Sequence, residues 1–368
     1  MRVLHLFKVY LPDSFTGVER VIWQIAEGTA PLGVSTDVLS LSANPASEPV
    51  PVANHWSHQA RLDLYLRSTG ISLSLLPRFQ ALLAQADIVH YHFPWPMMDL
   101  VHLLGRVQKP SVVTYHSDVV RQKNLLRLYR PLMHRFLGAA DRIVATSPDY
   151  AASSPVLGQY RDKLSVIPIG IAEPPAPDPA RLAALRARVG AGFFLFVGAL
   201  RYYKGLPFLL QAARATGLPV VIAGGGDDAI VRQEQLPNVT LLGEVDEADK
   251  AALLSLCGAF VFPSHLRSEA FGVALLEAAQ AGKPMISCAM GTGTSYVNLD
   301  GVTGITIPPA DAAALANAMQ RLSADPEGAA RMGEAAHHRY EDLFTAEAMG
   351  QSYARLYREL LANKAGAA

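Results

Sequence analysis

Two glutamates eight residues apart carry the clearest chemical pattern in the sequence. Glu269 and Glu277 lie in SEAFGVALLEAAQAG, residues 268–282, which follows an apolar run and has the composition of a helix. Unpaired amides at a helix start bind phosphate, and Gly272 lets a ligand approach the backbone closely. A carboxylate such as Glu277 accepts hydrogen bonds from sugar hydroxyls. The alternative is an ordinary helix with Ser268 as N-cap and Glu269 in its first turn.

A second segment, FVGALRYYKGLPFLLQA, residues 196–212, places two cations between an apolar run and a helical pattern. The segment contains Gly198, Arg201 and Lys204. Two cations of this kind suit the binding of a phosphate group. The alternative is a solvated loop whose charges bind nothing.

Histidines follow apolar runs in the first half of the chain. His116 ends the run 110–116, and Asp118 comes two residues later. Ligand residues of parallel sheets lie at the carboxyl ends of strands, so this position suits a substrate contact. His90 and His92, in VHYHFPWP, are predicted to follow another strand end and to line the acceptor side. No close carboxylate or cysteine completes a metal ligand set at a familiar spacing, so no metal site is predicted.

Two glycine-rich segments complete the candidate sites. Gly17, after Thr16, begins the helical segment TGVERVIWQIAEGTAPLG, although a glycine at a helix start is a common turn residue. In GTGTSYVN, residues 291–298, Thr292 and Ser295 offer hydroxyls to a sugar or phosphate. The same segment lacks the third glycine and the nearby acid of a dinucleotide fingerprint, which disfavours a redox enzyme.

These residues require elements that position them, and apolar runs alternate with helical patterns throughout the chain. Such runs, rich in Val and Ile without strict alternation, are typical of buried parallel strands. Helices between them predict βαβ units and an α/β fold with two parallel sheets. The predicted strands are 1–7, 35–41, 86–92, 110–116, 142–147, 164–169, 192–198, 219–224, 239–244, 258–264, 284–289 and 304–309.

A proline-rich seam divides the chain. Residues 173–179 hold four prolines and two acidic residues, which resist both helix and strand. The predicted domains are therefore 1–172 and 173–345, each about domain-sized. Residues 346–368 are predicted to form a C-terminal helix that packs on either domain, with the N-terminal one preferred.

Composition and charge exclude several classes of protein. The formal net charge is zero at pH 7, which argues against a nucleic-acid partner. Cys257 and Cys288 are too few for a disulfide framework. No signal peptide or membrane-spanning run is recognisable, so the prediction is a cytoplasmic protein. The basic amphipathic segment 121–142 is either an ordinary domain helix or a peripheral attachment to an anionic membrane surface.

The segment Ser-Glu-Ala-Phe-Gly-Val-Ala-Leu-Leu-Glu-Ala resembles the Glu-x7-Glu motif of the retaining GT-B glycosyltransferases of family four. The resemblance implies two Rossmann-like domains facing an interdomain cleft. It implies that Glu269 lies near the donor sugar and that Glu277 holds the nucleotide ribose. The backbone amides of Ala270, Phe271 and Gly272 would lie along the diphosphate and the sugar.

Other segments resemble the same family in the expected order. Lys204 with the following Gly205 matches the family's Gly-Arg-Leu…Lys-Gly segment, which includes Gly198. The usual Arg position holds Ala199, and Arg201 is expected to take over its role. His116 and Asp118 match the family's histidine that faces the donor sugar. Gly17 matches its first-domain glycine loop, with Thr16 in place of the first Gly.

The resemblance also implies a substrate. The stretches LRYYKG, SHLRSEAFG and GTGTSYVN resemble bacterial O-antigen enzymes that transfer mannose or D-rhamnose from a GDP-sugar. The expected acceptor is a glycan on a polyprenyl diphosphate carrier, with no metal and no cofactor. A UDP-sugar donor, a nucleotide-sugar epimerase on the same fold and a non-catalytic binding module remain alternatives.

Overall fold

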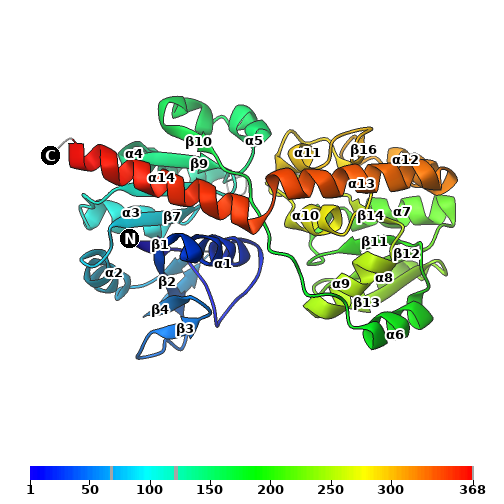
Figure 1. Ribbon diagram of the computed structural model, residues 1–368, viewed down its shortest axis with the longest axis horizontal. Coiled ribbons are helices and arrows are strands. Elements are labelled where there is room, and N and C mark those ends of the chain that lie inside the picture. Colours follow the sequence, from blue (N-terminus) through cyan, green and yellow to red (C-terminus); the bar gives the residue numbers. More distant parts are fainter. Residues whose placement is uncertain (67–68, 120–122, 367–368) are drawn as a thin grey trace. The chain divides into compact units, whose positions relative to one another are not determined.

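The computed structural model describes residues 1–66, 69–119 and 123–366. It divides into two compact units, shown in Figure 1. The first unit comprises Met1–Ala172 together with Ala346–Ala368, and the second comprises Glu173–Thr345. The two units are therefore joined by two chain connections.

The first unit is built on an eight-stranded sheet with the order β10-β9-β8-β7-β1-β2-β4-β3. All neighbouring strands are parallel except β3 and β4. Its strands are β1 Arg2–Leu6, β2 Ser35–Ser42, β3 Val50–Val52, β4 His55–Arg61, β7 Ile88–Phe93, β8 Ser111–Tyr115, β9 Arg142–Ala145 and β10 Leu164–Val166. A separate antiparallel hairpin comprises β5 Leu64–Leu66 and β6 Thr69–Ile71.

Helices cover both faces of this sheet. Its helices are α1 Gly17–Thr29, α2 Leu75–Leu83, α3 Pro96–Leu104, α4 Lys123–Ala139, α5 Pro148–Ser153 and α14 Ala346–Gly366, with 3₁₀ turns at Ala30–Leu32, Leu157–Gln159 and Arg161–Lys163. Tyr91 of β7 packs on His102 of α3 and Phe136 of α4. His90, which alternates to the other face of β7, contacts Tyr353 and Tyr357 of α14.

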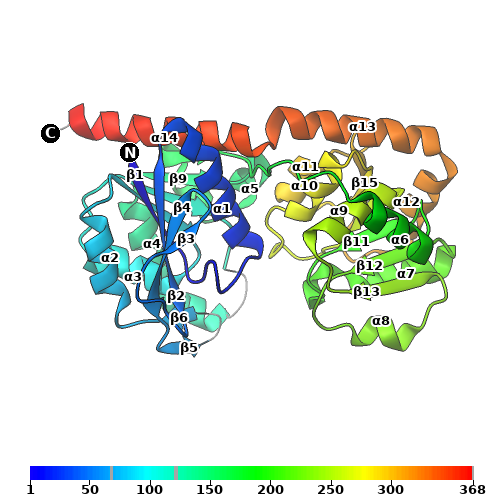
Figure 2. The ribbon, with the colours of Figure 1, turned by 60° about the horizontal axis from the view of Figure 1, so that its bottom comes forward.

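The C-terminal helix α14 packs against α1, as Figure 2 shows. The two helices cross at glycines, because a Cβ built on Gly350 would strike the backbone carbonyl of Gly28. Gly28 is packed as closely, because a Cβ built on it would lie 2.7 Å from the carbonyl oxygen of Ala346. Residues 346–366 thus complete the first unit.

The polar strand β4 and the hairpin β5–β6 were not predicted from the sequence. The sequence of β4, HWSHQAR, lacks an apolar run, yet His55, Ser57 and Gln59 are buried. Their polar atoms are satisfied, since His55 bonds to Tyr10 and Glu27, at 2.8 Å each, and Ser57 donates to the carbonyl of Leu11 at 2.6 Å. Hydrogen bonds rather than apolar surface allow this strand to be buried.

The second unit is a six-stranded parallel sheet with the order β13-β12-β11-β14-β15-β16. Its strands are β11 Phe194–Val197, β12 Val220–Ala223, β13 Val239–Gly243, β14 Ala259–Phe262, β15 Met285–Cys288 and β16 Gly304–Ile307. Its helices are α6 Pro179–Val189, α7 Leu206–Thr216, α8 Ala229–Glu234, α9 Glu247–Leu256, α10 Val273–Gln280, α11 Gly293–Val297, α12 Ala312–Ala324 and α13 Pro326–Leu343, with a 3₁₀ turn at Tyr202–Lys204. The apolar faces of α7 and α12 pack on its core strands.

Strand order reverses once in each sheet. The reversal lies between β1 and β7 in the first unit and between β11 and β14 in the second. In open parallel sheets, ligands bind at the carboxyl ends of the strands beside such a reversal. Among the described residues, no helix is both long enough and apolar enough to cross a membrane.

Candidate active site

Two loops meet at the strand reversal of the second unit. Lys204 lies in the loop after β11, and Glu269 lies in the loop after β14. The Lys204 Nζ is 2.5 Å from the Glu269 Oε2, and the Ser264 Oγ donates to the same oxygen at 3.4 Å. The fold therefore pairs a cation and a carboxylate that are 65 residues apart.

The backbone fixes the position of Lys204. Gly205 has a φ of +77°, and a Cβ there would strike the carbonyl oxygen of Pro263, so the turn requires glycine. The Lys204 ammonium lies 4.7 Å from the ring centroid of Phe262, and its side chain is 12% exposed. A cation that is held so firmly loses little conformational entropy when an anion binds.

Arg201, the other predicted cation, behaves differently. It is exposed and precedes the 3₁₀ turn Tyr202–Lys204. Its guanidinium forms no hydrogen bond or ion pair with any residue that the structure describes. Gly198 lies between β11 and Arg201, and a Cβ built on it would lie 3.9 Å from the Lys204 Nζ.

The helix after Glu269 begins later than the ordinary-helix alternative predicts. Helix α10 begins at Val273, with Gly272 as its N-cap at a φ of +84°. Ser268 is therefore not an N-cap, and Glu269 lies in a loop ahead of the helix. The amides of Ala270, Phe271 and Gly272 donate to no described residue, so this loop presents unpaired N–H groups next to a helix start.

The loop that precedes α11 packs against the loop 270–272. The Gly293 amide donates to the carbonyl of Ala270 at 2.8 Å. A Cβ on Gly293 would lie 2.7 Å from the Cα of Phe271, so the two loops pack in direct backbone contact. Thr292 is buried and bonds to the Thr294 hydroxyl at 3.0 Å, whereas Ser295 is half-buried. Thr292 therefore serves the loop rather than a ligand.

Glu277 lies in α10 and is paired with a lysine that sequence reasoning missed. The Lys250 Nζ lies 2.5 Å from the Glu277 Oε1 and 2.7 Å from the Glu247 Oε2. Lys250 belongs to α9, and its spacing from Glu277 carries no recognisable signal. Both members of the pair are mostly buried, with 12% and 16% of their side chains exposed. The ion pair fixes the carboxylate for hydrogen bonding.

In the first unit, His116 follows β8 directly and lies at the end of a row of histidines. The His116 Nε2 is 2.9 Å from the His92 Nδ1, and the His92 Nε2 is 2.9 Å from the His5 Nδ1. His90 bonds to Tyr357 and Thr114, both at 2.7 Å. Burial lowers the pKa of both His5 and His116 to about 3, and lowers those of His90 and His92 well below the usual value.

The prediction for His90 and His92 was wrong. Both lie within β7 rather than after it, and both are completely buried, so neither lines an acceptor surface. Their spacing of two places them on one face of the strand, beneath α14.

Three of the histidines are close enough together to be considered as metal ligands, because His5, His90 and His92 bring ring nitrogens within 4.8 Å of one another. Within the described residues, five of their six ring nitrogens already have hydrogen-bond partners, and only the His5 Nε2 has none. A metal would have to break several of these bonds. The donor set therefore fits a hydrogen-bonded row better than a metal centre.

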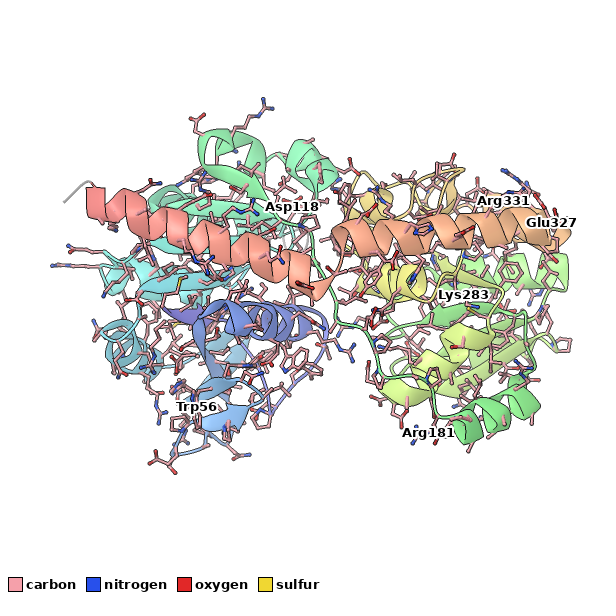
Figure 3. The ribbon with its side chains drawn as sticks, in the orientation of Figure 1. Trp56, Asp118, Arg181, Lys283, Glu327 and Arg331 are labelled. Atoms are coloured by element: carbon pink, nitrogen blue, oxygen red, sulfur yellow. The ribbon has the colours of Figure 1, made fainter. Side chains whose placement is uncertain are left out.

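Asp118, labelled in Figure 3, is held by its surroundings. Its Oδ1 accepts from the Tyr115 hydroxyl at 3.0 Å and from the Ser154 hydroxyl at 2.7 Å, while its amide donates to Tyr150. This carboxylate fixes the loop that follows His116. A cavity of about 250 Å³ lies beside it, and the remaining lining residues are Val119, Arg130, Met133, Pro155 and Val156.

Gly17 is the first residue of α1, exposed, with no atom within 4 Å of a Cβ built there. Nothing in the protein requires glycine at this position. Glu19, which sequence reasoning did not single out, is buried two residues later. It accepts hydrogen bonds from Ser14 at 3.0 Å and Thr16 at 3.2 Å. The Thr-x-x-Glu spacing at the helix start is the signal that indicates it.

Comparison with known proteins gives matches over both units. Residues 182–339 match the family described as Glycosyl transferases group 1, and residues 15–173 match Glycosyltransferase Family 4. The chain is 54% identical to D-rhamnosyltransferase WbpZ of Pseudomonas aeruginosa, over 94% of this chain and 93% of that protein. It is 48% identical to O-antigen chain mannosyltransferase C of Escherichia coli, over 99% of this chain and all of that protein.

Among solved structures, sucrose-phosphate synthase from Thermosynechococcus elongatus is similar, with a TM-score of 0.81 and 24% identity. The match covers 98% of this chain and 99% of that chain. At this identity the similarity concerns the fold, which is the GT-B fold expected from the sequence.

Proposed function

Because the chain belongs to the glycosyl transferases group 1 family, we propose that it transfers mannose or D-rhamnose from a GDP-sugar to a lipid-linked or oligosaccharide acceptor in O-antigen synthesis. The family makes the chain a hexosyltransferase. The choice of sugar is supported by the two relatives, one named a D-rhamnosyltransferase and the other an O-antigen mannosyltransferase. The GDP donor and the polyprenyl diphosphate carrier of the acceptor belong to the proposal.

The observation that carries the proposal is the position of Lys204 beside Glu269 and the loop 270–272. A diphosphate needs cations and N–H donors, and this site offers a fixed ammonium, an exposed guanidinium at Arg201 and a row of unpaired amides. Glu277 is proposed to accept hydrogen bonds from the ribose hydroxyls. Gly17 is proposed to let the donor approach the backbone at the start of α1 closely.

In the proposed reaction, the bond between the anomeric carbon and the diphosphate oxygen breaks as the acceptor hydroxyl bonds to that carbon on the same face. The configuration is retained, and the acceptor's proton passes to the departing phosphate. Lys204 and Arg201 stabilise the negative charge that develops on the leaving group, so no metal is needed. His116 contacts the donor sugar, and Asp118 holds the loop that positions it.

The function is tested by isothermal titration of the full chain with GDP, UDP and NAD in the presence of EDTA. Binding of GDP without UDP, followed by transfer from GDP-mannose or GDP-D-rhamnose, is the expected result. Preference for UDP would keep the family and overturn the donor. Binding of NAD alone, or a requirement for a divalent cation, would contradict the proposed site.

Replacing Glu277 with alanine is expected to raise the Kd for GDP about 10- to 100-fold, because a hydrogen bond to a charged group contributes about 1.5–3 kcal/mol. The kcat at saturating donor should change much less. Lys250→Ala is the matched variant, since it frees the carboxylate without removing it. An unchanged Kd in Glu277→Ala, with the circular dichroism spectrum intact, would remove Glu277 from the ribose site.

We further propose that α4 attaches the protein peripherally to an anionic membrane. Arg127 and Arg130 are exposed, and 80% of Leu128 between them is accessible, while Tyr129, Met133 and Phe136 anchor the helix to the sheet. Lys123 begins the helix, Arg135 is exposed, and Arg121 of the predicted segment lies outside the described residues. An exposed leucine between arginines suits a lipid interface.

Co-sedimentation with vesicles containing an anionic lipid tests this attachment. Arg127→Glu should reduce the bound fraction, whereas Arg331→Glu, at an exposed arginine of the second unit labelled in Figure 3, should not. Binding that is absent at low salt, or equal in both variants, would rule the attachment out.

A further inference from the structure

Three buried histidines of the first unit form a chain of hydrogen bonds in which donors and acceptors can be ordered in one direction or the other. His5 of β1, His92 of β7 and His116 after β8 lie on three neighbouring strands, on the face covered by α14. Their rings are nearly parallel, with interplanar angles of 20° and 21° and centroids 5.2 Å apart at each step. Each step is a single hydrogen bond between ring nitrogens, at 2.9 Å.

A neutral imidazole has one N–H donor and one bare nitrogen acceptor. Because the Nδ1 of His92 faces His116 and its Nε2 faces His5, the proton of His92 settles the direction of both bonds. Two arrangements satisfy the chain. In one, every ring carries its proton on Nδ1, and in the other every ring carries it on Nε2.

The buried end of the chain distinguishes the two arrangements. The His5 Nε2 is buried and has no hydrogen-bond partner among the described residues. Protonation of every ring on Nε2 would leave an orphaned N–H group there, whereas protonation on Nδ1 leaves only an unpaired acceptor. Buried donors without a partner are rarer than under-satisfied acceptors. The Nδ1-protonated arrangement is therefore favoured.

His116 is the outer end of the hydrogen-bonded histidines, and the tautomer matters at this residue. The Nε2 of His116 is occupied by His92, and its Nδ1 has no acceptor among the residues that the structure describes. His116 lies at the carboxyl end of β8, and 7% of it is exposed. Its Nδ1 is therefore the one ring atom of the chain that is available to a substrate.

We propose that His5 and His92 are positioning residues that fix His116 as the Nδ1–H tautomer, so that His116 donates a hydrogen bond to a hydroxyl or phosphate oxygen of the substrate and does not act as a general base. The identity of that oxygen as part of a nucleotide-sugar rests on the proposed function, whereas the tautomer does not. A neutral donor in a buried position stabilises a polar oxygen without bringing an uncompensated charge into the site.

The tautomers can be measured directly on the full chain without any substrate. Two-bond ¹H–¹⁵N correlation spectra of protein labelled with [¹⁵N]histidine distinguish a ring protonated on Nδ1 from one protonated on Nε2. His116→Gln and His92→Asn identify the signals of the two rings. Nδ1 protonation of both His92 and His116 is expected, and Nε2 protonation of His116 would overturn the proposal.

Substitutions at His92 test the consequence for catalysis. In His92→Asp, the carboxylate can only accept a hydrogen bond from the His116 Nε2–H, which reverses the tautomer. The kcat is expected to fall about 10- to 100-fold, with little change in the KM for the donor. His92→Asn can still donate an amide N–H to the same atom and should retain more activity than His92→Leu, which cannot.

Equal losses in the Asn and Leu variants would reduce His92 to a packing role, and wild-type activity in the Asp variant would remove the tautomer from catalysis. Failure of the proposed function can be told apart from failure of this proposal. The spectra report the tautomer even if the wild-type protein transfers no sugar from GDP-mannose, GDP-D-rhamnose or a UDP-hexose.

Discussion

Replacing Lys204 with alanine is expected to lower kcat for hexose transfer about 10²- to 10³-fold, which is the range measured when one preorganised donor is removed from a site of developing charge. The bond to the diphosphate breaks in the reaction, so the phosphate carries more negative charge in the transition state than in the bound donor. An ammonium held in place by Phe262 and Glu269 stabilises that charge without reorganising. The Kd for the intact GDP-sugar should change less, because the ground state carries less charge at the reacting oxygen.

Controls separate the loss of the lysine from the effect on its partner. Lys204→Ala leaves the carboxylate of Glu269 without its cation, next to the amides that are proposed to bind the phosphate. The double variant Lys204→Ala/Glu269→Gln removes that repulsion, and activity restored only partly would assign the remainder to the ammonium. Arg201→Ala is the second comparison, since this exposed side chain has no protein partner to leave behind among the described residues. Unchanged single-turnover rates in Lys204→Ala would exclude Lys204 from the transition state.

The first unit is expected to lose stability steeply below pH 6.5. Burial lowers the pKa of His5 and His116 to about 3, and it lowers the pKa of His90 and His92 well below the usual value. In the unfolded chain, each of these histidines takes up a proton as the pH falls through about 6.5. The unfolded state therefore binds more protons than the folded state, and the free energy of unfolding decreases as the pH falls from about 6.5 towards 3.

The expected effect is large. Each pH unit contributes about 1.4 kcal/mol per histidine, so at pH 5 His5 and His116 alone cost about 4 kcal/mol, and His90 and His92 add to this loss. The total stability of a typical domain is about 5–15 kcal/mol. Urea unfolding at pH 7, 6 and 5 measures the change, and tryptophan fluorescence reports it selectively, because all three tryptophans (Trp23, Trp56 and Trp95) lie in the first unit.

Two variants calibrate this measurement. His116→Asn removes one of the four groups and should reduce the proton uptake on unfolding by about one at pH 5. His338→Gln, at an exposed histidine of the second unit, should leave the fluorescence transition unchanged. A urea midpoint that is the same at pH 7 and pH 5 would show that the buried histidines do not govern acid stability.

Most strands could be predicted because they are apolar throughout. A parallel strand covered on both faces must bury residues of both parities, and the runs that contain β11, β12 and β14 have that composition. Strand β4 escaped prediction because its buried side chains are histidine, serine and glutamine, which are buried only through hydrogen bonds to residues distant in the chain. Local pattern does not reveal such partners.

In the candidate site, too, the residue types could be predicted from the sequence, whereas their partners could not. The residue types of Lys204, Glu269 and Glu277 point to phosphate and sugar binding before any fold is known. Their ion pairs, Lys204 with Glu269 and Lys250 with Glu277, depend on loops and helices that meet only in the folded sheet. His90 and His92 were misplaced because they were assigned to a strand end, although the predicted strand 86–92 already contained both and their spacing of two required a common face.

The return of α14 to the first unit has a consequence for how the protein is made. The Tyr353 hydroxyl bonds to Thr114 at 2.8 Å, and the Tyr357 hydroxyl bonds to His90 at 2.7 Å. Thr114 and His90 in the sheet therefore depend on α14 for these hydrogen bonds. Because a ribosome releases the chain from its N-terminus, the whole second unit emerges before the helix does. The second unit can fold as it emerges, whereas the first, although synthesised earlier, must wait with polar groups uncovered until the last helix has left the exit tunnel.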